Sequence, residues 1–463
     1  MEITLFGAAK EVTGSCYSLV TKNGEKILID CGMFQGSQYI EDKNYEDLEF
    51  DPSEYHAVIL THAHLDHCGR IPKLVRAGFK GPIYSTDATK DLAFIIMMDS
   101  AKIAKNDLPG ENRRRSDAHR SPRKLIYSEG DVNNAINLFK TVKYGEDIKI
   151  TENITAKFYD AGHILGAASI KLTVREENKA KTLAFSSDIG QKNSLIVKNT
   201  EPITDADYVF IESTYGDGIH PPRAEGEKQF LKIIKANQVR GGRLMIPSFA
   251  IERTQSLLYI ISQFQQKDLI PPVNVFLDSP MAIRVTEVFL KYPEYYNEEL
   301  RNSLKKRKDP FNFPGLVNTP TMRDSKKINN FSGPHIVIAG NGMCSGGRIE
   351  YYIKNYIDDK NNTLMFTGFQ AEGTLGRAIK SGEKKVRVLG SEVEVKAKIE
   401  VPEGFSAHAD RLGLMAWLKN FSPKPKKVFI VHGEEIQMKA FEKRVNAEGM
   451  KTRIPSFGEK IEL

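Results

Sequence analysis

The segment Thr61-His62-Ala63-His64-Leu65-Asp66-His67 is the most informative stretch of this sequence. The chain has only ten histidines in 463 residues, and three of them fall within this segment. It directly follows the apolar run His56-Ala57-Val58-Ile59-Leu60, which has the length and composition of a buried strand. The histidines therefore lie where a strand ends, a place from which a sheet presents polar side chains.

The spacing within this segment predicts a metal site. Side chains alternate between the two faces of extended backbone, so His62 and His64 point to the same side. Asp66 and His67 fall near the start of the next predicted helix, around residues 69–72. Neutral imidazole and carboxylate are the ligands that zinc prefers in catalytic sites. We therefore predict two imidazoles for one metal ion, and a carboxylate plus an imidazole for a second.

Polar residues at the ends of other predicted strands complete a coordination set. His163 and Asp188 each follow such a strand, and His432 ends the apolar run from residue 428. An aspartate has two oxygens and is suited to bridge two metals. Taken alone, each residue is equally well interpreted as an ordinary strand-end or turn residue. Asp30 ends another apolar run and is a candidate to orient a ligand histidine, with a simple turn-forming aspartate as the alternative.

Length and composition limit the number of domains and the class of protein. At 463 residues the chain suggests two or three domains, and its 40% hydrophobic and 27% charged residues are typical of a soluble globular protein. No apolar run approaches the roughly 20 residues of a membrane span. The first residues, Met1 to Phe6, favour a first strand over a signal peptide. The net charge of +7 and pI of about 8.9 are compatible with a polyanionic partner.

The four cysteines form neither a C-x-x-C pair nor a recognisable disulfide framework; they are Cys16, Cys31, Cys68 and Cys344. This usage favours a reducing, cytoplasmic compartment.

The pattern of predicted helices and strands changes twice along the chain. Through about residue 210, strand-length apolar runs alternate with helical stretches at 71–77 and 87–104, which indicates an α/β arrangement. From about residue 215, longer helical stretches at 226–238 and 251–265 and isolated strands suggest a second α/β unit. Strand signals return after about residue 395. The polar, basic segment 105–124 is predicted as a solvated loop, with an RNA-contacting loop as the alternative.

The run His62-x-His64-x-Asp66-His67 resembles the signature of the metallo-β-lactamase superfamily, and Asp30, His163 and Asp188 fit the same pattern. That resemblance implies a four-layer αβ/βα sandwich. It also implies that one zinc ion takes His62, His64 and His163. The second would take Asp66, His67 and His432, with Asp188 and a hydroxide as bridges.

Three further residues narrow the resemblance to the β-CASP branch, which processes nucleic acids. Glu212 matches the acid of motif A, His408 the histidine of motif B, and His432 the histidine of motif C. The implied organisation is a discontinuous metallo-β-lactamase domain at 1–210 and 395–463, with a β-CASP domain at 211–394. A histidine at motif C is associated with RNA-acting members. The chain is similar to short bacterial and archaeal homologues of the endonuclease subunit of the mRNA 3′-end cleavage complex. From where it begins and ends, we expect neither N-terminal KH domains nor the C-terminal domain of ribonuclease J.

The implied activity is hydrolysis of RNA phosphodiester bonds by a hydroxide that two metal ions activate, in endonucleolytic or 5′-exonucleolytic mode. Asp66 is a candidate proton acceptor. His408 is the candidate general acid, supported by Glu212, or else a ligand of the scissile phosphate. Two Zn²⁺ per chain are expected, with Mn²⁺ as an alternative ion. We expect single-stranded RNA as the partner and no membrane, and leave a homodimer open.

Contacts to the RNA backbone are expected from the insert. Arg253 stands at a predicted helix start. The glycine-rich segment 340–348, with Gly342, Ser345 and Arg348, and the segment around Thr374 resemble family segments that suit phosphate binding. Purely structural turns are an equally good interpretation of each.

Three other functions compete with a ribonuclease. A small-molecule hydrolase of the same fold explains the metal ligands but not Glu212, His408 or the insert. A DNA nuclease is disfavoured by His432. A non-catalytic RNA-binding subunit would lack metal ligands, and none is missing here.

Overall fold

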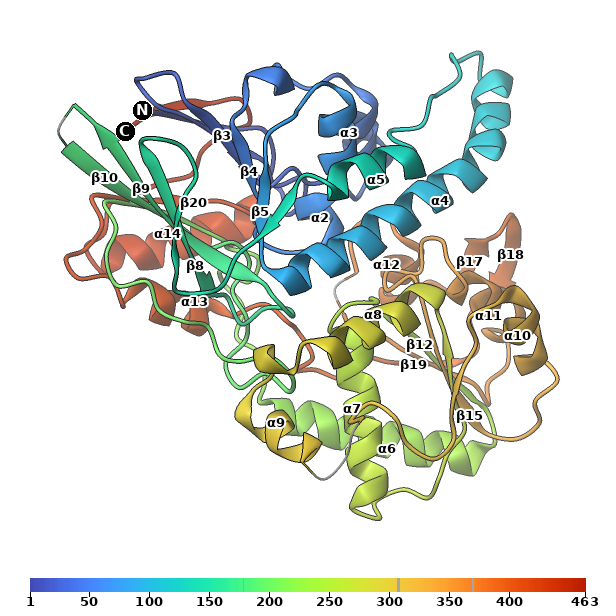
Figure 1. The fold of residues 1–463 in the computed structure, drawn as a ribbon. Coiled ribbons are helices and arrows are strands. Elements are labelled where there is room, and N and C mark those ends of the chain that lie inside the picture. The colour runs from blue at the N-terminus through green and yellow to red at the C-terminus, as the bar shows by residue number, and fades with distance from the viewer. Residues whose placement is uncertain (178, 306–308, 369) are drawn as a thin grey trace. The chain divides into compact units, whose positions relative to one another are not determined.

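The computed structural model describes residues 1–177, 179–305, 309–368 and 370–463. These form two compact units (Figure 1). One, here called the first unit, comprises residues 1–219 and 408–463, and the other, the inserted unit, comprises residues 220–407. The chain thus leaves the first unit once and returns to it, as an inserted domain requires.

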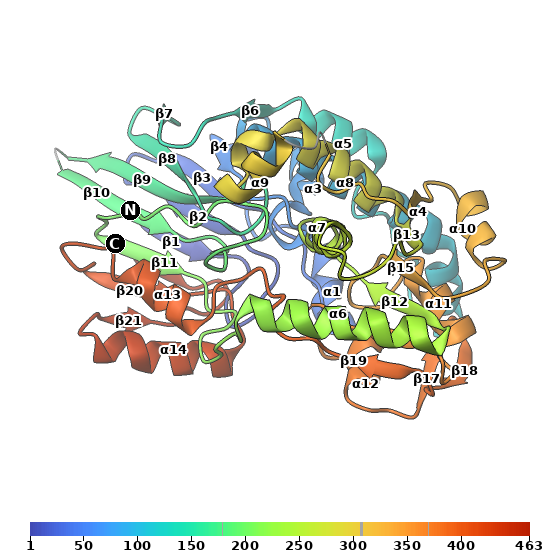
Figure 2. The same cartoon turned by 90° about the horizontal axis from the view of Figure 1, so that it is seen from below.

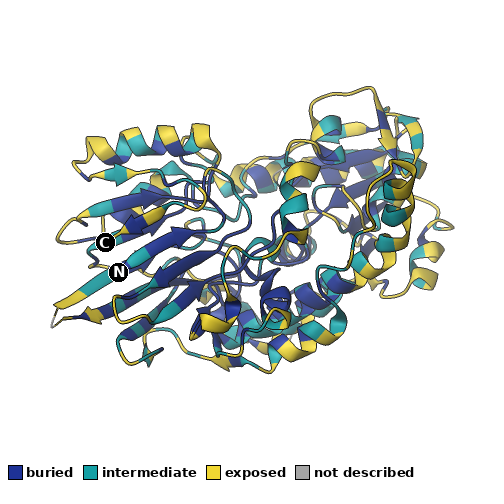
Figure 3. Ribbon diagram, turned by 90° about the horizontal axis from the view of Figure 1, so that it is seen from above, coloured by how far each residue is buried: buried dark blue, intermediate teal, exposed yellow. Residues whose placement is uncertain are grey.

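Two seven-stranded sheets build the first unit. The strand order in one sheet is β22-β1-β2-β3-β4-β5-β6, with bounds Lys460–Glu462, Glu2–Leu5, Tyr17–Val20, Lys26–Ile29, Ala57–Ile59, Ile83–Ser85 and Phe139–Thr141. The order in the other is β21-β20-β11-β10-β9-β8-β7, with bounds Thr452–Arg453, Lys427–Ile430, Tyr208–Ile211, Lys179–Phe185, Ala168–Glu176, Ile154–Asp160 and Asp147–Lys149. Because β22 pairs with β1, both chain ends lie on one sheet (Figure 3).

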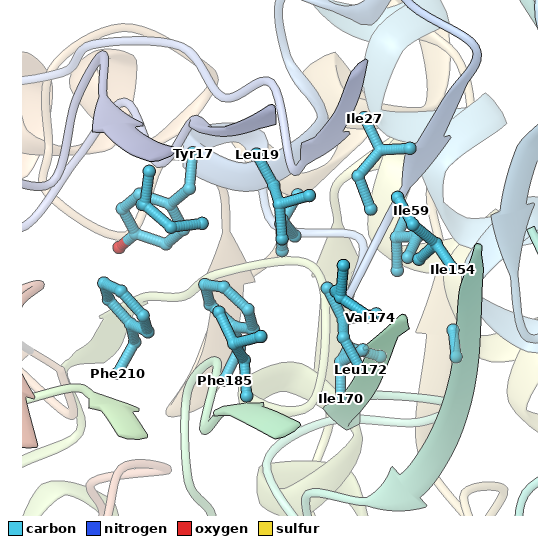
Figure 4. Close-up of a cluster of buried hydrophobic side chains, with 14 of the residues drawn as sticks. Tyr17, Leu19, Ile27, Ile59, Ile154, Ile170, Leu172, Val174, Phe185 and Phe210 are labelled. Carbon is cyan, nitrogen blue, oxygen red and sulfur yellow. The ribbon is translucent and has the colours of Figure 1, made fainter. Parts of the chain in front are cut away.

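The inner faces of these sheets form one hydrophobic core. Leu19, Ile27 and Ile59 from the first sheet face Ile170 and Phe185 from the second (Figure 4). Burying apolar side chains from both sheets is the main stabilising term of such a sandwich. Packing of the two inner faces holds the strands of both sheets, and the loops that follow them, in fixed positions.

Helices cover the outer faces. The first part of the chain supplies α1 to α5, at Gln38–Asp42, Leu65–Cys68, Ile71–Arg76, Asp87–Asp117 and Glu129–Ile136, with 3₁₀ turns at Lys43–Tyr45 and Pro52–Glu54. The returning chain supplies α13 (Arg411–Leu418) and α14 (Glu435–Ala447). Figure 2 shows both helices beside β20 and β21. Their apolar residues form one buried cluster with Val209, Ile211 and Ile430 of the second sheet. Two sheets between helical layers make the four-layer αβ/βα sandwich, so the expected fold class is confirmed.

The inserted unit is built on a six-stranded sheet in which every pairing is parallel. Its order is β14-β13-β15-β12-β16-β19, with bounds Leu316–Asn318, Val275–Asp278, His335–Ala339, Arg243–Pro247, Thr363–Met365 and Lys398–Glu400. A hairpin of β17 (Lys385–Val388) and β18 (Ser391–Glu394) follows. The helices are α6 to α12, at Arg223–Arg240, Arg253–Gln266, Pro280–Lys291, Glu298–Leu304, Met322–Ile328, Ile349–Tyr356 and Leu375–Lys380, with a 3₁₀ turn at Pro293–Tyr295.

Some sequence expectations differ from the structure at element ends. The strand signal just after residue 395 corresponds to β19, which pairs with β16 and so packs in the inserted unit. The compact units accordingly change at 219/220 and 407/408, whereas the sequence placed domain boundaries at 210/211 and 394/395. The predicted loop at 105–124 was wrong over residues 105–117, because α4 continues to Asp117. Among the described residues, none of the helices combines the length and the apolar character of a membrane span.

Candidate metal centre

The predicted metal ligands all stand in loops of the first unit, just beyond the ends of strands or in the turn of helix that follows. His62 and His64 follow β4, and Asp66 and His67 lie in the short helix α2 rather than in α3. His163, Asp188 and His432 follow β8, β10 and β20. All seven side chains converge, and their ligand atoms form groups that could hold a metal ion.

Three histidines form the first group. The Nδ1 atom of His64 lies 3.1 Å from His62 Nε2 and 3.2 Å from His163 Nε2. Asp188 Oδ2 faces this group, at 3.5 Å from His62 Nε2 and 3.6 Å from His163 Nε2. Four donor atoms thus surround one point.

The second group contains Asp66, His67 and His432. The two Nε2 atoms of these histidines are 3.3 Å apart, and Asp66 Oδ2 lies 3.8 Å from that of His67 and 3.6 Å from that of His432. Asp188 Oδ1 lies 3.5 Å from His67 Nε2 and 3.6 Å from His432 Nδ1. Asp188 therefore presents one oxygen to each group, the arrangement of a bridging ligand.

The chemistry of these residues fits bound cations. Asp188 Oδ1 is buried and has no hydrogen-bond donor among the described residues, an arrangement that a metal ion would satisfy. Burial lowers the pKa of His62, and lowers that of His64 to about 4, so both rings are neutral, the form that ligates metals. Burial opposes a charge on His67 too, yet the carboxylates of Asp188, Asp30 and Asp66 hold its pKa well above the usual value. The pocket therefore favours positive charge.

Asp30 orients one ligand of each group. Its Oδ2 accepts a hydrogen bond from His67 Nδ1 at 2.7 Å, which leaves His67 Nε2 for the metal. It also reaches His62 through the hydroxyl group of Thr61, whose Oγ1 lies 3.2 Å from His62 Nδ1, and through that of Ser187. His62 Nδ1 lies 3.2 Å from Ser187 Oγ, Ser187 donates to Thr61 Oγ1 at 2.8 Å, and Thr61 donates to Asp30 Oδ2 at 2.8 Å.

The sequence interpretation missed three residues of this support. Thr61 and Ser187 carry the hydroxyl chain, and Thr214 Oγ1 lies 3.3 Å from His432 Nδ1. Thr61 and Ser187 each directly precede a predicted ligand, and Thr214 lies two residues beyond Glu212. Their position beside these residues was the available signal.

Close backbone approach fixes the loops. A Cβ atom at Gly32 would lie 1.5 Å from the carbonyl oxygen of Asp66, and one at Gly190 would lie 1.7 Å from that of Gly162. Only glycine permits these contacts, which press the loops of Asp30 and Asp188 against those of the histidines. Asp30, Ser187 and His432 also adopt positive φ values of 60°, 53° and 48°. Such left-handed backbone in non-glycine residues is strained and is concentrated at functional sites.

His408 and Glu212 lie beside the metal ligands. Glu212 accepts a hydrogen bond from the backbone N–H of Ile189 at 2.6 Å, and its two carboxylate oxygens lie 3.4 and 3.3 Å from His408 Nδ1. The His408 ring is 4.5 Å from that of His163, centroid to centroid. Burial lowers the pKa of His408, but the Glu212 carboxylate and the more distant Asp188 and Asp66 outweigh it and raise the pKa to about 9. The His408 ring therefore carries its proton near neutral pH.

The five substrate-binding candidates lie in the inserted unit and differ in what they contact. Arg348 donates from Nη1 to Asp278 Oδ1 at 2.6 Å and to the Thr319 carbonyl at 2.7 Å, so its guanidinium holds the unit together. Thr374 caps α12 through its Oγ1. Gly342 is buried against the ring of Phe249, and Ser345 is exposed.

Arg253 begins α7, with its guanidinium 5.9 Å from the Phe405 ring centroid. Of the five candidates, Arg348, Thr374 and Gly342 thus have structural roles within the inserted unit, while Arg253 keeps the helix-start position that the sequence predicted.

Comparison with known proteins agrees with this geometry. Family models match at residues 10–132 (metallo-beta-lactamase superfamily), 254–379 (Beta-Casp domain) and 392–455 (Zn-dependent metallo-hydrolase RNA specificity domain). Ribonuclease TTHA0252 of Thermus thermophilus is 36% identical over the full length of both chains.

Two similar proteins come from Methanocaldococcus jannaschii. An RNase J-like protein is 34% identical over 94% of this chain and 93% of its own. Transcription termination factor FttA is 31% identical over 94% of this chain and 67% of its own. The chain therefore belongs to the β-CASP branch of the metallo-β-lactamase superfamily, among its zinc-dependent ribonucleases.

Proposed function

We propose that this chain hydrolyses phosphodiester bonds of single-stranded RNA at a centre of two zinc ions, in endonucleolytic or 5′-exonucleolytic mode. The observation that carries the proposal is the position of Asp188, whose Oδ2 faces His62 and His163 while its Oδ1 faces His67 and His432. A single carboxylate shared by two ligand groups is the hallmark of a two-metal site. Mn²⁺ is an alternative ion for the same oxygen and nitrogen ligands.

Zinc ions bound by the two groups would activate a water molecule and stabilise negative charge on the phosphate oxygens. The protein's own residues orient the ligand rings and accept or donate protons. Asp30 holds the ring of His67, and through Thr61 and Ser187 that of His62, so that their Nε2 atoms face the centre. The Asp66 side chain is 17% exposed whereas that of Asp188 is 2% exposed. Asp66 is therefore the carboxylate placed to accept the proton of the attacking water.

His408 is the proposed general acid. Glu212 engages its Nδ1, which directs Nε2 away from that carboxylate, and its side chain is 22% exposed. An imidazolium in this position can protonate the leaving oxygen as the P–O bond breaks. Because the pKa of His408 is raised by Glu212, the ring carries its proton at neutral pH. If His408 instead bound the scissile phosphate, its loss would raise KM rather than lower kcat.

RNA rather than DNA is the proposed substrate on two grounds. The motif C residue is a histidine, His432, which stands in the second ligand group. The relatives are named as a ribonuclease and a transcription termination factor, and the match at 392–455 is to an RNA specificity domain. We further propose that the β-CASP domain corresponds to the inserted unit. The free, buried cysteines support a reducing cytoplasm, and a homodimer would be revealed by the mass of the protein in solution.

The test is cleavage of matched, internally labelled single-stranded RNA and DNA by zinc-loaded protein. We expect RNA to be cut and DNA to survive, and the fragment lengths to distinguish the two modes of cleavage. Equal cleavage of DNA would remove the argument from His432. No cleavage of either polymer by protein with two zinc ions bound would point to a small-molecule substrate.

A further inference from the structure

Helix α4 extends well beyond the part of it that is buried. Its eight buried residues all lie between Ala88 and Ala101. From Lys102 to Asp117, every residue of which the structure describes, none is buried. Figure 1 shows this second half projecting past α3 and α5. Helices in proteins are stabilised mainly by packing an apolar face, so four exposed turns require another explanation.

The exposed half and the segment that returns from it are strongly basic. Residues 102–124, here called the basic arm, contain eight Lys and Arg against three Asp and Glu, a net charge of +5. Lys102 and Lys105 lie 3.9 and 3.8 Å from Glu129. Most of the remaining positive charge lies near the tip.

Two arginines hold the tip in shape. Arg115 Nε donates to the Ser121 carbonyl at 2.7 Å. Arg123 pairs with Asp42 and Glu111, and its guanidinium lies 4.1 Å from the centroid of the Tyr45 ring. The Asn112 side chain binds both the N–H and the carbonyl of Arg123, at 2.7 and 3.1 Å. The returning segment is therefore fixed against the helix.

Four other cations of the tip are presented to solvent. Arg113, Arg114, Arg120 and Lys124 are exposed, and within the described parts of the chain no carboxylate lies within ion-pair distance of them. Guanidinium groups match the geometry of phosphate oxygens, and exposed unpaired cations gain affinity by displacing the counterions of a polyanion. Because Arg115 and Arg123 fix the backbone, these four side chains are displayed on an ordered scaffold.

We propose that the basic arm is a docking surface for the phosphate backbone of RNA, separate from the metal centre. The inference rests on the proposed function, since the polyanion is the substrate itself. The arm is attached close to the chemistry, because Thr86 and Thr89 at the start of α4 both donate at 2.8 Å to the carbonyl of Gly166, in the loop that carries His163.

The length of α4 sets the length of RNA that can use both places. Its 31 residues include Pro109, at which a helix bends, so at about 1.5 Å per residue the tip lies at most about 45 Å from that loop. A stacked strand rises roughly 3.4 Å per nucleotide, so about 13 nucleotides span this distance. An RNA much shorter than this cannot contact the metal centre and the tip together.

The experiment compares two variants of equal charge. The arm variant carries R113Q, R114Q, R120Q and K124Q. The control variant carries K140Q, K143Q, K149Q and K451Q, which replace four exposed lysines of the first unit outside the arm. Both are made in full-length, zinc-loaded protein that also carries H408A to slow cleavage. Affinities for single-stranded RNAs of about 40 and about 6 nucleotides are measured by fluorescence anisotropy across a salt series.

We expect the arm variant to bind the long RNA about tenfold or more weakly at roughly 0.1 M salt. The slope of log affinity against log salt concentration should become less steep by about 0.7 for each phosphate that the arm no longer neutralises. The control variant should bind the long RNA as the parent does, and the short RNA should not distinguish the variants. The inference is overturned if the arm variant binds long RNA normally, which would assign the arm to another anionic partner such as a membrane surface. It is also overturned if both variants lose affinity equally.

Failure of the proposed function gives a different result. The binding assay, in the H408A background, tests the docking surface. The proposed function is tested separately, by cleavage of the short RNA with protein that retains His408. A protein that cuts no RNA but binds long RNA through the arm would sink the proposed function and leave the docking surface intact.

Discussion

Two buried aspartates, Asp188 in the first unit and Asp278 in the inserted unit, are held in opposite ways. In the first unit, Asp188 and its neighbours converge with ligand atoms directed at common points, and Asp188 Oδ1 lacks a donor among the described residues. In the inserted unit, the fully buried Asp278 is satisfied by Thr319, Ser325, Tyr352 and Arg348, each at 2.6 to 2.7 Å. A polar cluster whose members satisfy each other stabilises a fold, whereas one with directed, unsatisfied atoms is built for a ligand.

The largest effect should follow from Asp188→Asn. An amide offers one oxygen and no charge, so it cannot serve both ligand groups. We expect RNA cleavage to fall to background and the zinc content, measured by atomic absorption, to drop by at least one ion per chain. Wild-type zinc content with full activity would remove Asp188 from the centre and weaken the contrast between the units.

His408→Ala should come next. Loss of a general acid typically lowers kcat by about 10²- to 10⁴-fold. KM and bound zinc should remain near their wild-type values, because His408 is not a predicted ligand. A large rise in KM with kcat preserved would instead assign His408 to binding of the scissile phosphate.

Asp30→Asn and Ser187→Ala test how the ligand histidines of the first unit are held. Loss of a group that orients a ligand typically lowers metal affinity about 10- to 100-fold. Asp30 supports His67 directly and His62 through Thr61 and Ser187, so Asp30→Asn should weaken binding of both ions. Ser187→Ala should weaken mainly the one held by His62, and by less, because Thr61 still contacts that ring. Competition with a zinc chelator measures the two affinities, and identical losses in both variants would contradict the hydroxyl chain.

Glu212→Gln should alter the pH dependence of cleavage. Glu212 raises the pKa of His408 to about 9, so its loss lowers that pKa. The protonated, acid-competent ring then disappears at lower pH, and the basic limb of the kcat profile should move to lower pH. Zinc ions bound to Asp66 and Asp188 would offset the contribution of these two carboxylates to the raised pKa of His408. This applies equally to the wild type and the variant, so the direction of the expected pH shift is unchanged. A basic limb that stays in place would separate Glu212 from proton transfer.

Arg348→Ala should affect stability rather than chemistry. It removes the cation that pairs with buried Asp278, which keeps three hydroxyl donors, and losing a hydrogen bond to a charged group costs about 2 kcal/mol. We expect a lower midpoint of thermal unfolding with kcat near wild type. Arg253→Ala is the matched variant, and it should weaken RNA binding with little change in the midpoint. A variant Arg348→Ala with reduced RNA affinity and unchanged stability would contradict the structural role of Arg348 at Asp278.

Much of the fold was predictable because its signals are local. Apolar runs of strand length, each followed by a polar residue, located β3, β4, β10, β11 and β20 to within a few residues. The extent of α4 was missed because residues 102–117 are mostly polar and none of them is buried, so no periodic apolar pattern marks this part of the helix. The place of β19 was missed because strand pairing is not local.

The sequence by itself determined which side chains are candidates for the chemistry, since residue type and position after a strand are properties of the chain. Only the tertiary structure decided how they work together. His67 and His432 are 365 positions apart and meet at 3.3 Å because strands of two packed sheets end at one place. The two faces of Asp188, the hydroxyl chain to Asp30 and the engagement of Arg348 by Asp278 are distances between loops. Such distances are set by packing, which no single segment encodes.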